Sequence, residues 1–157
     1  MKVRLLHHTP SPKEFIGNIA SICYDSIPSE KIVDHCFDSG HESVLEHVTF
    51  TFKIEGVSRA LTHQLVRHRI ASPTQRSQSY VVEDCFNYVV PPTLRTNTEI
   101  ECEYHALLQH IQEFYNKAVQ HGIPAEDARY ILPNAAVSTI VITMNLRSLI
   151  NFMHLRL

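Results

Sequence analysis

The chain has 157 residues, enough for one compact domain and too few for two of ordinary size. Its formal charge of -2 excludes a globally basic protein that binds nucleic acid or an anionic membrane through overall charge. No apolar stretch approaches the ~20 residues of a membrane span, and the N-terminus lacks the apolar core of a signal peptide. The four cysteines contain no C-x-x-C pair and are typical of reduced thiols. We therefore expect a cytoplasmic protein that binds neither nucleic acid nor membrane.

Hydrophobic periodicity predicts alternating helices and strands along the whole chain. Pro73 should stop the central helix near Ala71, Gly56 should end the first strand, and Asn145 should open the last helix. In chain order, we expect helices over 13–25 and 29–37, a strand over 48–54, a helix over 57–71, a polar loop over 72–79, a strand over 80–82, helices over 99–120 and 124–132, a strand over 136–143 and a helix over 146–155. With no repeats or linkers, this pattern predicts an α+β single domain.

Three basic or potentially basic residues, Arg67, His68 and Arg69, follow one another where the central helix should end. Consecutive helical side chains point about 100° apart, so they can surround a ligand or serve two sites but cannot all face one partner. The polar loop from Ser72 to Ser79 follows directly and contains no Gly. Two readings remain open from spacing alone: a loop that grips a polar anion, or a basic helix end that complements the helix dipole.

The motif Arg-His-Arg, then seven residues, then Ser77 resembles the signature of the flavin-dependent thymidylate synthases. The resemblance extends over roughly residues 13–157 in three further blocks in the same order. These are Gly40-His41-Glu42-Ser43 with Glu46-His47 and Phe50-Thr51-Phe52; Pro124 to Arg129 with Leu132-Pro133; and Asn145-Leu146-Arg147-Ser148-Leu149 with Asn151-Phe152 and Leu155-Arg156.

The resemblance implies the family's fold and its chemistry. It implies a single domain over 1–157 with an antiparallel sheet flanked by helices. The implied reaction is the reductive methylation of dUMP to dTMP, with methylenetetrahydrofolate as one-carbon donor and NADPH as reductant of FAD. By the same resemblance, the protein is a homotetramer whose subunits share active sites, and no enzyme nucleophile is needed.

The family's site residues carry over to matching positions here. Arg156 is expected to be catalytic, because in the family it lies against the uracil and favours its ionised form. The residues expected to contact FAD are Ser43, Arg67, His68, Arg69, Gln75, Asn145, Arg147 and Asn151. The residues expected to contact dUMP are Gln64, Arg67, Gln75, Arg76, Ser77, Gln78, Ser79, Arg129 and Arg156.

The sequence departs from the family pattern at two informative places. Ser79 stands where the family has an Arg that helps to hold the nucleotide phosphate, and Arg76 is the candidate substitute. The chain ends at Leu157, one residue after Arg156, whereas family members usually continue for several tens of residues. We therefore expect a domain without the family's C-terminal segment. A truncated or degenerate member that binds flavin and nucleotide without full catalysis remains an alternative.

Two other features of the sequence are typical of unrelated functions, a metal site and a nucleic-acid-binding surface. The segment from His41 to His47 resembles a zinc motif, but its histidines are six residues apart and lie about 240° apart on a helix, so we expect no metal site. Arg59, His63 and Arg67 form a basic stripe at helical spacing, which a nucleic-acid-binding protein would use. The acidic net charge and the lack of an aromatic platform argue against that second function.

Overall fold

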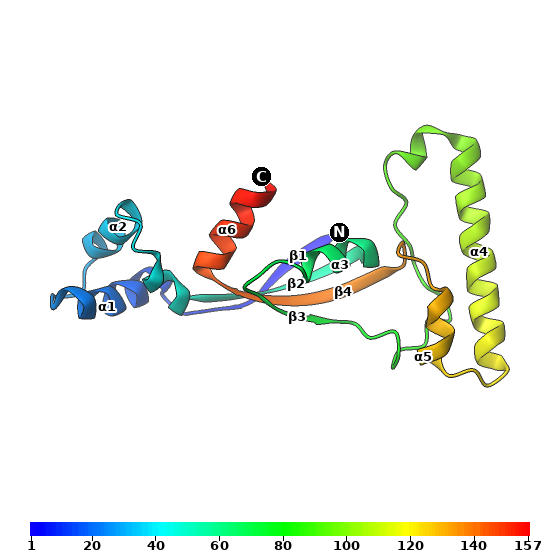
Figure 1. The fold of residues 1–157 in the computed structure, drawn as a ribbon, viewed down its shortest axis with the longest axis horizontal. Helices are drawn as coiled ribbons and strands as arrows, with labels where there is room; N and C mark the ends of the chain where they lie inside the picture. Colours follow the sequence, from blue (N-terminus) through cyan, green and yellow to red (C-terminus); the bar gives the residue numbers. More distant parts are fainter. The chain divides into compact units, whose positions relative to one another are not determined.

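The computed structural model describes residues 1–157 and contains four strands, six α-helices and three short 3₁₀-helices (Figure 1). The elements are β1 (Lys2–His8), α1 (Pro12–Tyr24), α2 (Glu30–Asp38), η1 (Glu42–His47), β2 (Thr49–Ser58), α3 (Arg59–Leu65), β3 (Ser72–Gln75), η2 (Leu94–Thr96), α4 (Thr98–Gln120), α5 (Ala125–Ala128), η3 (Arg129–Ile131), β4 (Val137–Asn145) and α6 (Leu146–Arg156). None of the helices combines the length and the apolar character that crossing a bilayer requires.

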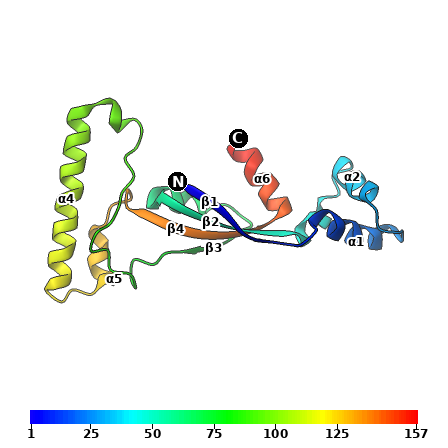
Figure 2. The same ribbon diagram turned by 180° about the vertical axis from the view of Figure 1, so that it is seen from behind.

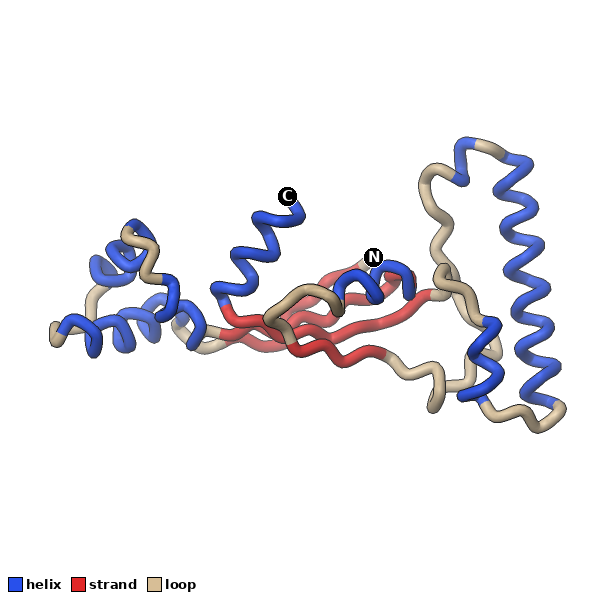
Figure 3. Tube along the Cα trace, viewed as in Figure 1, coloured by secondary structure: helices blue, strands red, loops and turns tan.

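The four strands form one antiparallel sheet in the order β1-β2-β4-β3, drawn in red in Figure 3. A cross-strand pair fixes the register of β2 and β4, since the hydroxyls of Thr51 and Thr143 lie 2.9 Å apart. Alternate residues of β4 are buried, as expected for a strand with one face on a core. The predicted α+β class with an antiparallel sheet and accompanying helices is confirmed.

The chain divides into two compact units, which are described separately below. Unit 1 consists of Met1–Lys2, Ile54–Leu65 and Gln75–Ile140, and unit 2 of Val3–Lys53, Val66–Thr74 and Val141–Leu157. The expectation of a single domain that lacks a C-terminal segment stays a prediction.

Unit 1 is organised by α4, which packs against α5 and η3. The helices α4 and α5 lie side by side in both views (Figures 1 and 2). The side chain of Asn97 caps α4, accepting hydrogen bonds from the backbone N–H groups of Glu99 (3.1 Å) and Ile100 (3.2 Å). Tyr115 is fully buried and Leu108 is nearly so. This helix therefore offers a rigid face to the loop that precedes it.

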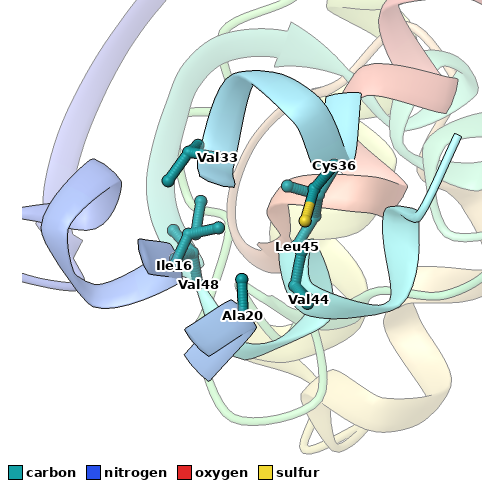
Figure 4. Close-up of a cluster of buried hydrophobic side chains, with 7 residues drawn as sticks. All are labelled: Ile16, Ala20, Val33, Cys36, Val44, Leu45 and Val48. Atoms are coloured by element: carbon teal, nitrogen blue, oxygen red, sulfur yellow. The ribbon is translucent and has the colours of Figure 1, made fainter. Parts of the chain in front are cut away.

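Unit 2 is built around a hydrophobic core contributed by α1, α2, η1 and Val48, which lies between η1 and β2 (Figure 4). The helix α1 packs on α2 and η1, and α6 packs on η1. The core side chains are Ile16, Ala20, Val33, Cys36, Val44, Leu45 and Val48. The core holds η1 in place, which matters because η1 supplies one wall of the candidate site.

Several predicted elements agree with the structure. The helices predicted over 13–25, 29–37, 99–120 and 146–155 and the strand predicted over 136–143 correspond to α1, α2, α4, α6 and β4. Asn145 caps α6 as predicted, accepting the backbone N–H of Ser148 at 2.8 Å. The helix predicted over 124–132 is divided between α5 and η3.

Four predictions about the central segment were wrong. The strand β2 continues through Gly56 to Ser58, because Gly56 adopts a φ of 71° that keeps the chain in the sheet. The helix α3 ends at Leu65, well before Ala71, and a strand, β3, replaces the expected polar loop over 72–75. Pro73 fits in β3 because β3 is an edge strand. No strand forms over 80–82, and β1 was not anticipated at all.

Candidate active site

The largest group of predicted flavin-contacting residues surrounds one pocket in unit 2. The pocket has a volume of about 400 Å³ and opens between η1, the segment after α3 and the first turns of α6. Four of the predicted residues line it: Arg69, Asn145, Arg147 and Asn151. Its other lining residues are Glu42, Leu45, Glu46, Ile70, Ser148, Ile150 and His154. A cavity of this size, mixed in polarity, suits part of a cofactor.

Arg147 is held in this pocket by two carboxylates of η1. Its Nε donates to Glu42 Oε2 at 3.1 Å, and its Nη1 donates to Glu46 Oε1 at 2.6 Å. These hydrogen bonds, the one to Glu46 first, raise the pKa of Arg147. All three side chains are about half exposed, so the pairs contribute little to the free energy of unfolding. Their effect is to fix the direction of the guanidinium.

His68 lies beneath the surface of unit 2, with only 9% of its area exposed. Its Nε2 is buried and has no hydrogen-bond partner. The imidazole packs edge-on against Phe152, with ring centroids 5.0 Å apart, and the guanidinium of Arg156 lies 5.9 Å from the centroid of the same Phe152 ring. Two residues expected at the active site therefore share one aromatic neighbour on α6.

Like His68, the other three predicted flavin-contacting residues lie outside the pocket lining. Ser43 is exposed on η1, and Arg67 is exposed in the turn after α3. Gln75 belongs to unit 1, where its Nε2 donates to Thr62 Oγ1 at 2.7 Å and to Ser138 Oγ at 3.1 Å. The pocket in unit 2 thus gathers about half of the set that the sequence predicted for FAD.

Most residues predicted to contact dUMP belong to unit 1. Gln78 and Arg129 line a hollow of about 210 Å³ together with Tyr130. Arg129 is oriented by a hydrogen bond from its Nε to the Glu126 carbonyl at 3.0 Å, and its guanidinium lies 6.0 Å from the centroid of the Tyr130 ring. This arrangement leaves the Nη groups of Arg129 available to an anion.

The other nucleotide candidates of unit 1 have defined surroundings. Ser77 Oγ accepts the backbone N–H of Ser79 at 3.2 Å, which stabilises a turn at this point of the loop. The guanidinium of Arg76 pairs with buried Glu83, with Nη1 and Oε1 3.2 Å apart. Gln64 is exposed on α3.

Sequence comparisons identify the family of the chain. The family described as thymidylate synthase complementing protein matches residues 4–157. The flavin-dependent thymidylate synthase of Geobacter sulfurreducens is 44% identical over 170 residues, which cover 99% of this chain and 73% of the relative. The one from Pyrococcus furiosus is 40% identical over 173 residues, covering 100% of this chain and 71% of the relative. The chain belongs to the flavin-dependent thymidylate synthase family.

A solved structure shows the same fold as this member of the family. Thymidylate synthase X from Helicobacter pylori, whose crystal structure contains FAD and dUMP, superposes with a TM-score of 0.78. It is 24% identical in sequence, and the match covers 99% of this chain and 84% of that chain. The predicted family and fold class are therefore confirmed.

Sequence reasoning about this family member missed the acidic side of the pocket. Glu42 and Glu46 lie in the block that carries the resemblance, but neither was expected to line a site. Their spacing of four residues, followed much later by Arg147, was the available signal, because such carboxylates can share one face of a helical turn. Glu83, the buried partner of Arg76, gave no signal in the sequence.

Some of the abundant histidines form hydrogen bonds with tyrosine side chains. No group of three His, Cys, Asp or Glu side chains is placed so that it could hold a metal ion. His41 Nδ1 forms a hydrogen bond with the Tyr24 hydroxyl, and His105 Nδ1 lies 2.7 Å from the Tyr88 hydroxyl. The expected absence of a metal site stays a prediction about the protein in solution.

Replacing Gln75 by alanine should reduce the free energy of unfolding by about 1–3 kcal/mol, because the buried Ser138 hydroxyl loses its hydrogen-bond partner and Thr62 Oγ1 keeps only its own hydrogen bond to the Arg59 carbonyl. Thr62 is fully buried and Ser138 is 3% exposed, so water cannot replace the lost donor. Urea denaturation of the apoprotein measures the change. The matched control is Gln78→Ala in the loop that follows β3, which should change stability by less than about 0.5 kcal/mol; equal losses for the two variants would contradict this role of Gln75.

Proposed function

We propose that this chain makes dTMP from dUMP by reductive methylation, with FAD as its cofactor. Methylenetetrahydrofolate would donate the one-carbon unit, and NADPH would reduce the flavin. The observation that carries the proposal is the gathering of Arg69, Asn145, Arg147 and Asn151 around one pocket of a chain from this family. Relatives that are 44% and 40% identical bear the name flavin-dependent thymidylate synthase.

The residues present fit a flavin on physical grounds. The buried Nε2 of His68 has no partner in the protein, and a buried polar atom of this kind normally has one. Arg69 brings positive charge to the wall of the pocket, which suits the pyrophosphate of FAD, and Arg147 can donate a hydrogen bond from Nη2, which neither Glu42 nor Glu46 contacts. Asn145 and Asn151 add amide groups that can form hydrogen bonds with the cofactor. When bound, FAD supplies the reducing chemistry, and the protein supplies its placement.

The remaining predicted contacts to FAD are Ser43, Arg67, His68 and Gln75. We propose that Arg67 and Gln75 also contact dUMP, so that flavin and nucleotide meet at shared residues. A homotetramer in which neighbouring subunits complete each active site would bring the two sets of residues together, and this part of the proposal rests on the family alone. We further propose that the enzyme is cytoplasmic.

The nucleotide would be bound through its phosphate and its base. Arg129 and Gln78, which line one hollow, supply a cation and an amide for the phosphate. Gln64, Ser77 and Ser79 offer further hydrogen-bonding groups for the sugar and the base. The hydrogen-bonded turn at Ser77 and Ser79 keeps this loop ordered before the nucleotide arrives.

Arg156 would act on the uracil ring electrostatically. The side chain is exposed in the last turn of α6, forms no ion pair and lies over Phe152, so its charge is available to a ligand. A guanidinium held against the uracil would stabilise the ionised, negatively charged form of the ring, and this form is the better nucleophile. No cysteine is needed for this route: Cys36 belongs to the hydrophobic core, and none of the cysteines lines the two pockets named above.

The absorption spectrum of the purified protein tests the cofactor. We expect flavin absorbance in the fresh protein, or its recovery when FAD is added to the apoprotein. Conversion of dUMP to dTMP in the presence of methylenetetrahydrofolate and NADPH then tests the reaction. A colourless protein that takes up no FAD would refute the proposal at its first step.

Ser79, in place of the usual Arg, favours one second candidate function: a family member that binds flavin and nucleotide without turnover. The assay for dTMP formation distinguishes the two candidate functions. Protein that is loaded with FAD and binds dUMP but forms no dTMP would support the second candidate and exclude the first.

A further inference from the structure

The segment 77–82, which we call the nucleotide loop, contains residues predicted to contact dUMP and has little packing of its own. Gln78 lines the hollow proposed for the phosphate. The side chain of Tyr80 is 92% exposed, so it does not tie the loop to a core. A hydrogen bond from the Val81 N–H to the Ser77 carbonyl, at 3.3 Å, closes one turn. The position of the nucleotide loop therefore depends on how its two ends are held.

The first end of the nucleotide loop is fixed to the sheet through the backbone of Arg76. The Arg76 N–H donates to the carbonyl of Thr139 in β4 at 2.9 Å, and the Arg76 carbonyl accepts a hydrogen bond from Arg59 Nη1 at 3.3 Å. The preceding residue, Gln75, is the last residue of β3, and its side chain donates to two buried hydroxyls. Hydrogen bonds to several elements of unit 1 therefore hold the backbone where the loop begins.

The other end of the nucleotide loop is fixed to α4 at Glu83. The Glu83 N–H donates to the Tyr115 hydroxyl at 3.1 Å, and Gln112 Nε2 donates to the Glu83 carbonyl at 2.8 Å. The Gln112 side chain also accepts the N–H of Phe86 at 2.7 Å through Oε1. Because Tyr115 is fully buried, this attachment belongs to the well-packed part of unit 1.

An ion pair between Arg76 and Glu83 joins the two ends of the nucleotide loop. Arg76 Nη1 lies 3.2 Å from Glu83 Oε1, and the Glu83 side chain is 5% exposed whereas that of Arg76 is 40% exposed. A nearly buried carboxylate needs a cation beside it, since removing one partner of such a pair is costly. The ion pair thus closes the loop at its base and limits the conformations that residues 77–82 can adopt.

We propose that Glu83 is a positioning residue for the nucleotide: through its ion pair with Arg76, it holds the nucleotide loop in the conformation that binds dUMP. The inference rests on the proposed function, because the loop carries Ser77, Gln78 and Ser79, which are proposed to bind the nucleotide. A loop that is ordered before binding loses less conformational entropy when the ligand arrives. In this arrangement Arg76 acts with Glu83 on the loop and does not replace the phosphate-binding arginine that the family has where this chain has Ser79.

Amide hydrogen exchange of the purified protein, measured without dUMP, tests the positioning directly. Glu83→Gln keeps the shape of the side chain and removes its charge, so the ion pair is lost with little change in volume. The amides of Ser79 and Val81, which donate hydrogen bonds within the loop, should then exchange about threefold to tenfold faster than in the wild type. Exchange in residues 125–131, which form α5 and η3 in the same unit, should not change and serves as the internal reference.

Calorimetric titration of the FAD-loaded protein with dUMP distinguishes positioning from a contact with the phosphate. If Glu83 positions the loop, Glu83→Gln should weaken dUMP binding about threefold to tenfold, the cost of ordering the loop upon binding. If Arg76 were instead a phosphate ligand, the same variant would release its guanidinium and remove a negative charge, so the affinity would stay unchanged or rise. Glu103→Gln, which neutralises an exposed carboxylate of α4, is the matched control and should bind dUMP like the wild type.

Arg76→Gln removes the other partner of the ion pair. It leaves the buried carboxylate of Glu83 without a cation, so it should lower the thermal stability and weaken dUMP binding. Adding Glu83→Gln to this variant should recover stability, and the double variant should bind dUMP no more weakly than Arg76→Gln alone, since both lack the same ion pair. Arg95→Gln, which removes an exposed arginine of η2, should match the wild type in stability and affinity.

Two results would overturn the inference. One is wild-type exchange of the loop amides in Glu83→Gln. The other is a dUMP affinity of Glu83→Gln at or above that of the wild type; combined with a loss of affinity in Arg76→Gln, it would make Arg76 a phosphate ligand. A wild-type protein that binds FAD but not dUMP would instead contradict the proposed function, while hydrogen exchange would still test the ion pair, so the two failures are distinguishable.

Discussion

The Arg156→Ala variant should lose dTMP formation, with a decrease in kcat of about a hundredfold to a thousandfold. Arg156 is exposed at the end of α6 and forms no ion pair, so its removal costs the fold little. We propose that Arg156 stabilises the negative charge that develops on the uracil during the reaction. The loss of such an interaction lowers kcat more than it changes KM. Single-turnover formation of dTMP by the FAD-loaded protein measures the effect.

The control for Arg156 separates chemistry from binding. Arg95→Ala removes an arginine from η2 in unit 1, whereas Arg156 belongs to unit 2. The Arg95→Ala variant should form dTMP at the wild-type rate. The flavin spectrum and thermal stability of Arg156→Ala should also match the wild type, because Arg156 does not line the pocket assigned to FAD. Unchanged turnover in Arg156→Ala would refute the electrostatic role. Absence of turnover in the wild type would instead contradict the catalytic proposal.

The Arg147→Gln variant should bind FAD about tenfold to a hundredfold more weakly than the wild type, which corresponds to about 1.5–3 kcal/mol for a lost charge-assisted hydrogen bond. The substitution removes a cation from the pocket and also leaves Glu42 and Glu46 without their partner. Two uncompensated carboxylates would then face the anionic pyrophosphate of the cofactor. Fluorescence titration of the apoprotein with FAD measures the affinity.

Lys13 provides a closely matched control for Arg147. It also belongs to unit 2, is about half exposed and bridges two carboxylates, with Glu30 at 3.2 Å and Asp34 at 3.5 Å. It does not line the pocket. Lys13→Gln should therefore leave FAD affinity at the wild-type value. Equal losses in Lys13→Gln and Arg147→Gln would mean that net charge, and not the position of Arg147, governs flavin binding.

Sequence patterns were sufficient for the parts of the fold with strong local signals. The helix α4 was predicted from its long helical periodicity, and the start of α6 was predicted from Asn145, which caps it. The blocks from Gly40 to Phe52 and from Asn145 to Arg156 identified the family, which the comparisons then confirmed. Four of the predicted flavin residues do share one pocket.

The tertiary structure decided what local patterns could not. Strand β3 forms in a polar segment that contains Pro73 because β4 offers it hydrogen bonds, and pairing partners of this kind lie far apart in sequence. The same reason explains the extension of β2 through Gly56. Local sequence patterns also could not determine the ion-pair partners. Arg147 pairs with Glu42, which lies 105 residues away in the sequence, and Arg76 pairs with Glu83, whose backbone is held by a hydrogen bond to α4. The sequence by itself therefore determined the family and its basic motif, whereas only packing decided which arginines pair with carboxylates and how those carboxylates orient their guanidinium groups.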